Sequence, residues 1–387
     1  MEPIVAAEDL RDQVRRFLDE HVPAEAVDAW ERDQSTPRSL IRRLGEMGMC
    51  RYTVPVEYGG TGREIAKTLV VVEELARRSH SLAGLYWSHV AYCGLTITAT
   101  GTAEQKARLL PAAARGDVLF AYGLSEPDVG ADLAAVATTA ERLADKVIVK
   151  GRKRWTSNAD ASDYVYALVR TGPVEDKRRN LTFVLVPTAA PGVRIDKIDT
   201  MGDRGVGICE VEFDDVELSL DDVVGGPDAW NNGWAVLTGA TLEVEKLGVP
   251  AMCLGIAEAA VDEAWRYSQE RVQGGKRICG HQSIRHALVE AQTRLQACRL
   301  MVHHAGALVE AGRPAAVETS MAKLFVADTA KEIVLACQEV VGAPGLARGL
   351  GLRMERYVRD VIGLPIIGGS SAIQRNNIAS LMGLPRE

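Results

Sequence analysis

The chain of 387 residues is 47% hydrophobic and 25% charged, a composition typical of a folded globular protein. This length exceeds what one compact core usually holds, so we expect two or three structural units within one subunit. Lys and Arg number 45, and Asp and Glu number 52, which gives a net charge of −7. A mildly acidic chain is a poor candidate for a nucleic-acid-binding protein.

The N-terminus and the cysteines indicate the compartment. The N-terminus carries no signal-like segment, and the longest apolar runs fall well short of the roughly 20 residues that cross a bilayer. The seven cysteines stand singly, with no C-x-x-C pair, which indicates reduced thiols. We therefore expect a cytoplasmic protein with no membrane partner.

Residues 1–117 have the pattern of helices. Leu10, Val14 and Phe17 recur at helical spacing, and Thr36 followed by Pro37 is typical of a helix start. We expect an N-terminal helical domain over this range.

Residues 118–226 have a different pattern. Short runs rich in Val, Ile, Thr and Tyr alternate with turn residues, for example at 147–149, 164–169, 181–186 and 207–213. Regular short strands separated by polar turns predict a central antiparallel β domain.

Residues 227–387 return to helical periodicity, which predicts a C-terminal four-helix bundle. The expected fold class is therefore α+β and mainly helical. The order of the three patterns argues against simple alternation of strands and helices. No G-x-G-x-x-G sequence lies between a strand and a helix, so a Rossmann-type dinucleotide site is not expected.

Histidines and serines offer two other chemistries. His281 and His286 lie five residues apart, and His303 and His304 are adjacent, so neither pair has the i, i+4 spacing of a helical metal site. No G-x-S-x-G sequence suggests a serine hydrolase. We expect no bound metal.

Eight short segments resemble the acyl-CoA dehydrogenase family, in an order and at spacings that extend over nearly the whole chain. They are VPVEYGGTG at 54–62, GTAEQK at 101–106, LSEPDVGAD at 124–132, GRKRWTSN at 151–158, MGDRG at 201–205, ERVQGGK at 270–276, QEVVGAPG at 338–345 and IQR at 373–375. The resemblance implies the acyl-CoA dehydrogenase fold, with FAD between the β domain and the bundle.

The resemblance also implies which residues contact FAD. Tyr122, Leu124 and Ser125 match a stretch that lies along the flavin, and Trp155 and Ser157 match a second flavin-contacting strand. A flavin ring needs hydrogen bonds at its polar edge and a flat apolar wall, which these residue types supply. The alternative for Trp155 is a side chain that fills the β core.

Further residues match motifs that reach the FAD of a neighbouring subunit, namely Arg271, Gln273, Gln338 and Gly342. A diphosphate favours the forked donors of Arg, and Gly lets backbone approach closely. These matches imply a homo-oligomer, either a dimer or the tetramer usual in the family. The alternative is a surface arginine and a turn glycine. Ala131, in the segment at 124–132, and Ser370, just before the C-terminal motif, complete the implied cofactor-binding residues.

Two positions depart from the family pattern. Ala131 replaces the usual serine of the Glu-Pro-x-x-Gly-x-Asp turn, which removes a hydroxyl donor near the thioester tail or the diphosphate. Gly274 replaces the aromatic residue usually found after Arg-x-Gln, which leaves the adenine side less filled. FAD binding remains the expectation.

The dehydrogenation that the resemblance implies needs a carboxylate base. An acyl thioester loses its α proton to the base while hydride leaves Cβ for the flavin. A partly desolvated carboxylate with a raised pKa suits this weakly acidic C–H bond. Many members place a glutamate before Gly-Thr-x-x-Ile-Gln-Arg, but the matching residue here is Gly368, which cannot accept a proton.

Isovaleryl-type members carry the base on a helix of the bundle, in a pattern that resembles Leu-Asp-Leu-Glu-Arg. The chain reads LEVEKL at 242–247, which places Glu245 on the base and Glu243 on the neighbouring acid. Residues two apart on a helix point about 200° apart, so only one of them faces the flavin. Glu245 is the predicted base; the alternatives are Glu243, or two solvated carboxylates, one paired with Lys246, and no base. The predicted substrate-binding residues are Ala131, Glu243, Lys246 and Gly368.

The function that follows from the resemblance is FAD-dependent α,β-dehydrogenation of an acyl thioester to the trans-2-enoyl thioester. The acyl group is carried by CoA or by an acyl-carrier protein, and electrons pass to an electron-transfer flavoprotein or another acceptor. One alternative is a flavin oxidase or monooxygenase on the same fold. Another is a non-catalytic FAD-binding protein, which the vacancy at Gly368 favours.

Overall fold

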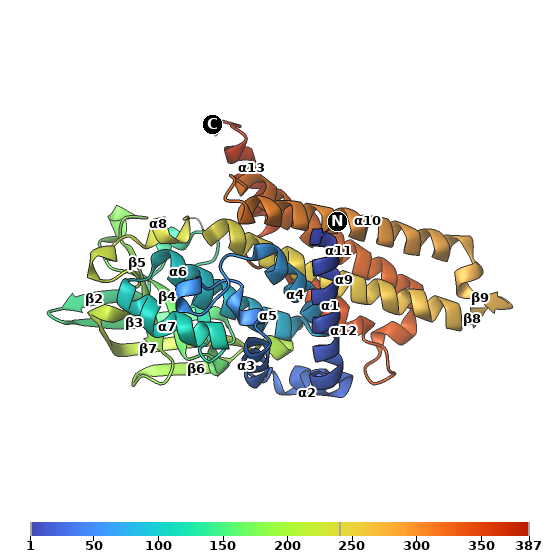
Figure 1. Ribbon diagram of the computed structural model, residues 1–387, viewed down its shortest axis with the longest axis horizontal. Coiled ribbons are helices and arrows are strands. Elements are labelled where there is room, and N and C mark those ends of the chain that lie inside the picture. Colours follow the sequence, from blue (N-terminus) through green and yellow to red (C-terminus); the bar gives the residue numbers. More distant parts are fainter. Residues whose placement is uncertain (1, 240, 386–387) are drawn as a thin grey trace.

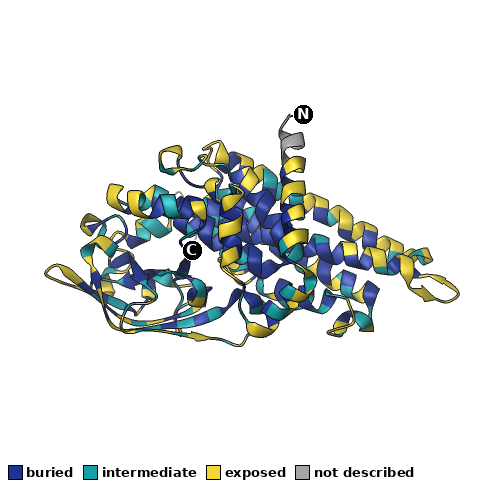
Figure 2. Cartoon of the chain, turned by 60° about the horizontal axis from the view of Figure 1, so that its bottom comes forward, coloured by how far each residue is buried: buried dark blue, intermediate teal, exposed yellow. Residues whose placement is uncertain are grey.

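The computed structural model describes residues 2–239 and 241–385 (Figure 1). The molecule is elongated. A curled β-sheet forms one end, long helices extend to the other, and the N-terminal helices lie between them (Figure 1). Buried residues concentrate where these three parts meet (Figure 2). The predicted acyl-CoA dehydrogenase fold, mainly helical with a central sheet, is confirmed.

The N-terminal part is helical, as predicted. Its helices are α1 (Glu2–His21), α2 (Ala24–Asp33), α3 (Ser39–Glu46), α4 (Ile65–Arg78), α5 (His80–Ser88), a π-helix (His89–Thr96), α6 (Ile97–Thr100) and α7 (Ala103–Arg115). Thr102 and Gln105 form a capping box that starts α7, since each side chain bonds the other's backbone N–H. The π-helix continues directly from α5 into α6, and nothing in the sequence had indicated it.

The central sheet has seven strands in the order β1-β4-β2-β3-β7-β6, with β5 paired to β4. The strands are β1 (Phe120–Gly123), β2 (Thr139–Leu143), β3 (Lys146–Ser157), β4 (Tyr164–Arg170), β5 (Leu181–Pro187), β6 (Val193–Lys197) and β7 (Ile208–Ser219). Most pairs are antiparallel, as predicted, but β4 pairs in parallel with β1 and β2, so the sheet is mixed. These parallel pairs join distant segments, which local sequence patterns cannot show.

The C-terminal part contains α8 (Gly233–Leu237), α9 (Thr241–Glu270), α10 (Gln282–Glu310), α11 (Ala316–Val341), α12 (Met354–Gly363) and α13 (Ser371–Leu381). A hairpin of β8 (Val272–Gln273) and β9 (Lys276–Arg277) joins α9 to α10. The three long helices pack together, and α4 packs against α9.

Two glycines let α9 approach the N-terminal helices closely. A Cβ on Gly248 would lie 2.1 Å from the Trp87 ring, and one on Gly255 would lie 2.2 Å from the carbonyl oxygen of Glu73. Any side chain at either position would force the helices apart. This close packing sets the first turns of α9 beside α5 and the π-helix.

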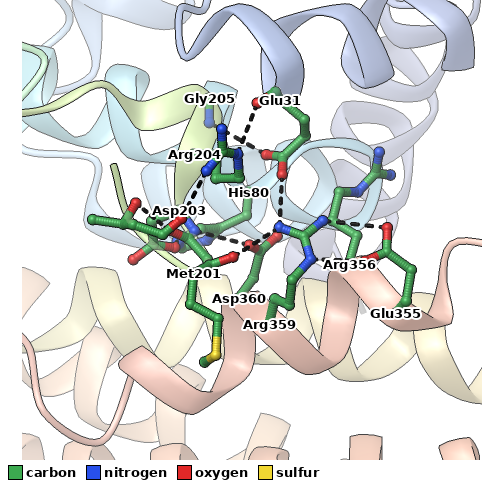
Figure 3. A network of polar contacts seen from close by, with 12 residues as sticks. Glu31, His80, Met201, Asp203, Arg204, Gly205, Glu355, Arg356, Arg359 and Asp360 are labelled. Carbon is green, nitrogen blue, oxygen red and sulfur yellow. Dashed lines mark hydrogen bonds and ion pairs between the residues drawn. The ribbon is translucent and has the colours of Figure 1, made fainter. Parts of the chain in front are cut away.

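A buried polar network joins all three parts of the chain at the loop of residues 201–207 (Figure 3). His80 Nε2 lies 2.7 Å from Asp203 Oδ1, and the Asp203 N–H donates to Asp360 Oδ1 at 2.9 Å. Arg359 Nη1 donates to Glu31 Oε2 at 3.2 Å. We call Glu31, His80, Asp203, Arg359 and Asp360 the three-part junction.

Two glycines of the loop, Gly202 and Gly205, have no room for a side chain where the loop crosses the junction. A Cβ on Gly202 would lie 2.2 Å from the carbonyl oxygen of Arg359, and one on Gly205 would lie 2.5 Å from the Ser81 hydroxyl. The carbonyl of Gly207 accepts a hydrogen bond from the N–H of Asn158 at 3.0 Å. Asn158 directly follows β3, so the junction is tied to the end of that strand.

The charged groups of the three-part junction shift one another's pKa values. Burial alone lowers the pKa of His80, but the adjacent Asp203 carboxylate outweighs burial and raises this pKa to about 9. Burial, followed by the charge of Glu31, raises the pKa of Asp360 to about 7, against the opposing effect of His80. His80 is therefore an imidazolium at neutral pH.

We expect His80→Gln to lower the free energy of unfolding by about 3 kcal/mol at pH 6, because it leaves buried Asp203 without its cation. The folded-state pKa of His80 lies above its unfolded value, so its stabilisation is complete below about pH 6.5. It is lost as the pH rises through 9. Urea unfolding of both proteins from pH 6 to 9.5 should show the difference shrinking. His286→Gln, at an exposed position on α10, should change little. If the unfolding free energies of the wild type and His80→Gln differ by the same amount at every pH, His80 is not the cation that stabilises Asp203.

Candidate functional site

Glu245 lies in the second turn of α9, half-buried, beside a group of tyrosines. Burial raises the pKa of Glu245 to about 8. Its negative charge adds to the burial that raises the pKa values of Tyr92, Tyr122 and Tyr166. The carboxylate therefore lies near three phenols, contributed by the π-helix, β1 and β4. A base in an apolar pocket with a pKa near neutrality suits proton abstraction from carbon.

Lys246 interacts with groups other than the tyrosines. Burial lowers the pKa of Lys246, and the charge of Glu243 partly offsets this effect. The Lys246 ammonium is buried and donates to the Ser320 hydroxyl of α11 at 3.1 Å. The structure thus gives Lys246 a partner within the helical bundle. Only Glu245 shares electrostatic interactions with the tyrosines.

Gly368 lies against the same helix as Glu245. Its φ is +61°, and a Cβ built on it would lie 3.1 Å from Val249 Cγ2. Val249 stands one turn after Glu245 on α9, so the two residues share a face of that helix. Gly368, which has no carboxylate, is therefore adjacent to the helical turn that follows Glu245. Ser370, two residues on, caps α13 by accepting a hydrogen bond from the Ile373 N–H at 3.3 Å.

The turn after β1 is held by a buried ion pair. Lys153 Nζ lies 2.7 Å from Glu126 Oε1 and also donates to the carbonyl of Leu124 at 3.1 Å. Glu126 accepts from the N–H groups of Ala137 and Thr138 at 2.6 and 2.9 Å. Burial lowers the pKa of Lys153 to about 8 despite the Glu126 charge. Sequence reasoning missed this pair, whose residues lie in two motifs 27 positions apart.

Trp155 is presented to solvent by a strained bulge in β3. The β3–β7 register shifts between Arg154 and Thr156, and Trp155 has a φ of +65° with 56% of its surface exposed. The alternative in which Trp155 fills the β core is therefore wrong. Backbone strain of this kind is sustained only where surrounding structure enforces it, and it concentrates at functional sites.

The bulge lies beside the turn after β1. The N–H of Arg154 donates to the carbonyl of Ser125 at 2.8 Å, so the two predicted flavin-contacting stretches are neighbours. Among the described residues, the hydroxyls of Ser125 and Ser157 have no hydrogen-bond partner. An exposed indole with free hydroxyls nearby fits the flat ring and polar edge of a flavin. Ala131 lies exposed on the loop beyond this turn.

The remaining predicted cofactor residues lie elsewhere. Arg271 and Gln273 are exposed on the β8–β9 hairpin, at the opposite end of the molecule from the sheet (Figure 1). Gln338 donates from Nε2 to the carbonyl of Gly342 at 2.9 Å, and Gly342 has a φ of +72° with open space around a built Cβ. Within one chain, the residues of the β8–β9 hairpin therefore do not lie near Trp155.

The described residues include neither a membrane-spanning helix nor a cluster of metal-ligating side chains. Over residues 2–239 and 241–385, no helix is both long and apolar enough to cross a membrane. Within the same ranges, no group of three or more His, Cys, Asp or Glu side chains is arranged to hold a metal ion.

Comparisons with known proteins place the chain in a family. Models of the N-terminal, middle and C-terminal domains of acyl-CoA dehydrogenases match residues 6–117, 121–216 and 231–383. The chain belongs to the acyl-CoA dehydrogenase family. It is thus an acyl-CoA dehydrogenase-like flavoprotein oxidoreductase of the CH–CH donor class, and its cofactor is FAD.

Relatives and solved structures align with nearly all of the chain. A 3-(aryl)acrylate reductase of Clostridium sporogenes is 32% identical, with 96% of this chain and 97% of that protein aligned. The caffeyl-CoA reductase–Etf complex subunit CarC of Acetobacterium woodii is 28% identical, with 96% of this chain and 97% of that protein aligned. Among solved structures, the acyl-CoA dehydrogenase of Geobacillus kaustophilus has a TM-score of 0.91 at 27% identity, over 98% of both chains. The structure of a prolyl acyl carrier protein oxidase has a TM-score of 0.89 at 25% identity, and the match covers 98% of this chain and 99% of that one.

We expect Lys153→Met to weaken FAD binding at least tenfold, because it leaves Glu126 buried without a cation and frees the turn that carries Ser125. Fluorescence titration of the apoprotein with FAD measures the change. Lys150→Met is the matched control, since Lys150 lies on the same strand but pairs with Asp215 at the surface. Equal affinities in the two variants would show that the buried pair does not position the turn.

Proposed function

We propose that the chain oxidises the α and β carbons of an acyl thioester to a trans-2-enoyl thioester, with Glu245 as the base. The observation that carries this proposal is the placement of Glu245. Its half-buried carboxyl group lies near tyrosines, its pKa is raised to about 8, and it is on the helix face that Gly368 contacts. This supports the isovaleryl-type arrangement, in which α9 supplies the carboxylate absent from position 368.

The side chains at the proposed site have separate roles. Glu245 accepts the α proton, and its apolar surroundings keep its pKa near the operating pH, where a general base is most effective. Trp155 supplies a flat wall, and Ser125 and Ser157 supply hydroxyls for the polar edge of the cofactor. FAD, when bound, supplies the hydride acceptor. The tyrosines shield the base from water, and this desolvation favours transfer of the α proton to the carboxylate.

Relatives support the choice of substrate carrier and electron acceptor. One relative acts on a CoA thioester within a complex with an electron-transfer flavoprotein, and one neighbour in structure acts on an acyl-carrier protein. Both carriers present the acyl group on a phosphopantetheine arm. We infer a CoA or carrier-protein thioester as substrate and an electron-transfer flavoprotein as acceptor. Fast oxygen consumption by the reduced enzyme would favour the oxidase alternative.

We expect Glu245→Gln to slow anaerobic flavin reduction by acyl thioesters at least a thousandfold, because the amide cannot accept the α proton. Stopped-flow bleaching of the flavin measures the rate. The wild-type rate should rise with pH through about 8, since only the ionised carboxyl group acts as base. Glu243→Gln is the matched control on the same helix. Reduction of Glu245→Gln at the parent rate would exclude Glu245 as base.

We also propose that the FAD site is shared between two copies of the chain, because Arg271 adjoins the β8–β9 hairpin, at the opposite end of the molecule from the sheet that contains Trp155 (Figure 1). We expect Arg271→Ala and Trp155→Ala each to lose most bound FAD when expressed alone. Co-expression should restore part of it, since mixed assemblies contain some sites with both residues intact. FAD content per chain and sedimentation velocity measure this effect.

The control for the shared site is Arg277→Ala, an exposed arginine on the same hairpin, which should keep its FAD. A monomeric protein that retains FAD, or mixed assemblies with no recovery, would contradict the shared site.

A further inference from the structure

We propose that Tyr92 and Tyr122 form an aromatic wall that closes the acyl site beside Glu245 and restricts the substrate to short acyl groups or to acyl groups that end in a flat ring. This inference rests on the proposed function, because it assumes that Glu245 acts on an acyl thioester. It names the substrate class of that site.

The two tyrosines meet across two elements of the fold. Tyr92 lies on the π-helix and Tyr122 on β1, and their ring centroids are 4.3 Å apart at an angle of 36°. Rings at this separation are in van der Waals contact. An acyl chain therefore cannot pass between the π-helix and β1 at this point. Both tyrosines are only partly buried, so each keeps part of its surface free to contact a ligand.

The wall is supported from behind by aromatic side chains that cannot move aside. Tyr122 stacks on Tyr166 with centroids 5.5 Å apart, and Tyr166 stacks on Phe183 at 4.4 Å. Tyr166 and Phe183 are fully buried in the sheet. Close-packed interiors have few voids to accept a displaced ring. The site therefore does not extend into the β domain.

The π-helix fixes Tyr92 in place. The Thr96 hydroxyl donates to the carbonyl of Ala91, five residues earlier, at 3.1 Å. The ring nitrogens of His89 each lie 2.9 Å from a backbone carbonyl oxygen, one of Val118 and one of Ala113. Val118 precedes β1 by two residues, so His89 ties the π-helix to the strand that carries Tyr122. Insertions of this kind in a helix occur frequently at functional sites.

The position of the base turns this wall into a length limit. The acyl α carbon must come within hydrogen-bonding distance of the Glu245 carboxylate for proton transfer. The helix α9, which carries Glu245, packs against the π-helix that carries Tyr92, and the charge of Glu245 acts on both wall phenols, so the wall begins close to that carbon. Carbons beyond Cβ therefore meet aromatic faces within a short distance. A flat ring stacks well on such faces, whereas a long flexible chain has no room.

The test measures flavin reduction in the purified holoenzyme with butyryl, 3-phenylpropionyl and octanoyl thioesters, each on CoA and on a carrier protein. We expect the wild-type kcat/KM for octanoyl to be at least tenfold below that for the other two. Tyr92→Ala should raise the octanoyl-to-butyryl ratio at least tenfold. Tyr92→Phe, which keeps the ring, should leave the ratio unchanged. Tyr92→Leu serves in place of Tyr92→Ala if the alanine variant does not retain FAD.

The matched control is Tyr164→Ala. Tyr164 lies on β4 and packs edge-on against Phe120, outside the wall, so its loss should not change the ratio. A wild-type enzyme that uses octanoyl as well as butyryl would overturn the inference, and so would an unchanged ratio in both Tyr92→Ala and Tyr92→Leu. These results leave the proposed function intact. The proposed function fails separately if none of the thioesters reduces the wild-type flavin.

Discussion

The buried charges at the three-part junction hold the rest of the structure in register. His80, Asp203 and Asp360 come from three different parts of the chain, and each would be costly to bury without the others. The parts must therefore dock in one arrangement. The same loop bonds Asn158 at the end of β3, so this arrangement also sets where the Trp155 bulge stands relative to α9.

Two glutamates near the site, Glu126 and Glu245, show how surroundings decide what a carboxyl group does. Glu126 is buried against Lys153 and two backbone N–H groups, and these outweigh burial and lower its pKa. Glu245 has no such cation, so burial raises its pKa to about 8. The paired carboxylate stays ionised and holds a turn, whereas the unpaired one can exchange a proton near neutral pH. The absence of a side chain at Gly368 leaves the proposed base role to Glu245 alone.

The aromatic residues act in two separate ways around this base. Trp155, forced outward by a bulge, offers an accessible face for the cofactor. Tyr92 and Tyr122, packed on each other, offer a closed face for the acyl group. Arg271 stands too far along the molecule to join them within one chain (Figure 1). An accessible face, a closed face and a distant arginine together agree with the proposal that a second copy of the chain completes the site.

The sequence by itself determined the helical, β and helical segments, because burial on one face of a helix or strand leaves a local period of hydrophobic residues. The motifs also pointed to the family and to a carboxylate at Glu245, since short segments carry their own pattern. Only the tertiary structure decided that β4 pairs in parallel with β1, that Lys153 neutralises Glu126, and that Tyr92 lies near Glu245, the proposed base. Each of these depends on contacts between residues far apart in the chain, for which the sequence has no local signal. The outward turn of Trp155 belongs with them, because the register of β7 against β3 imposes it.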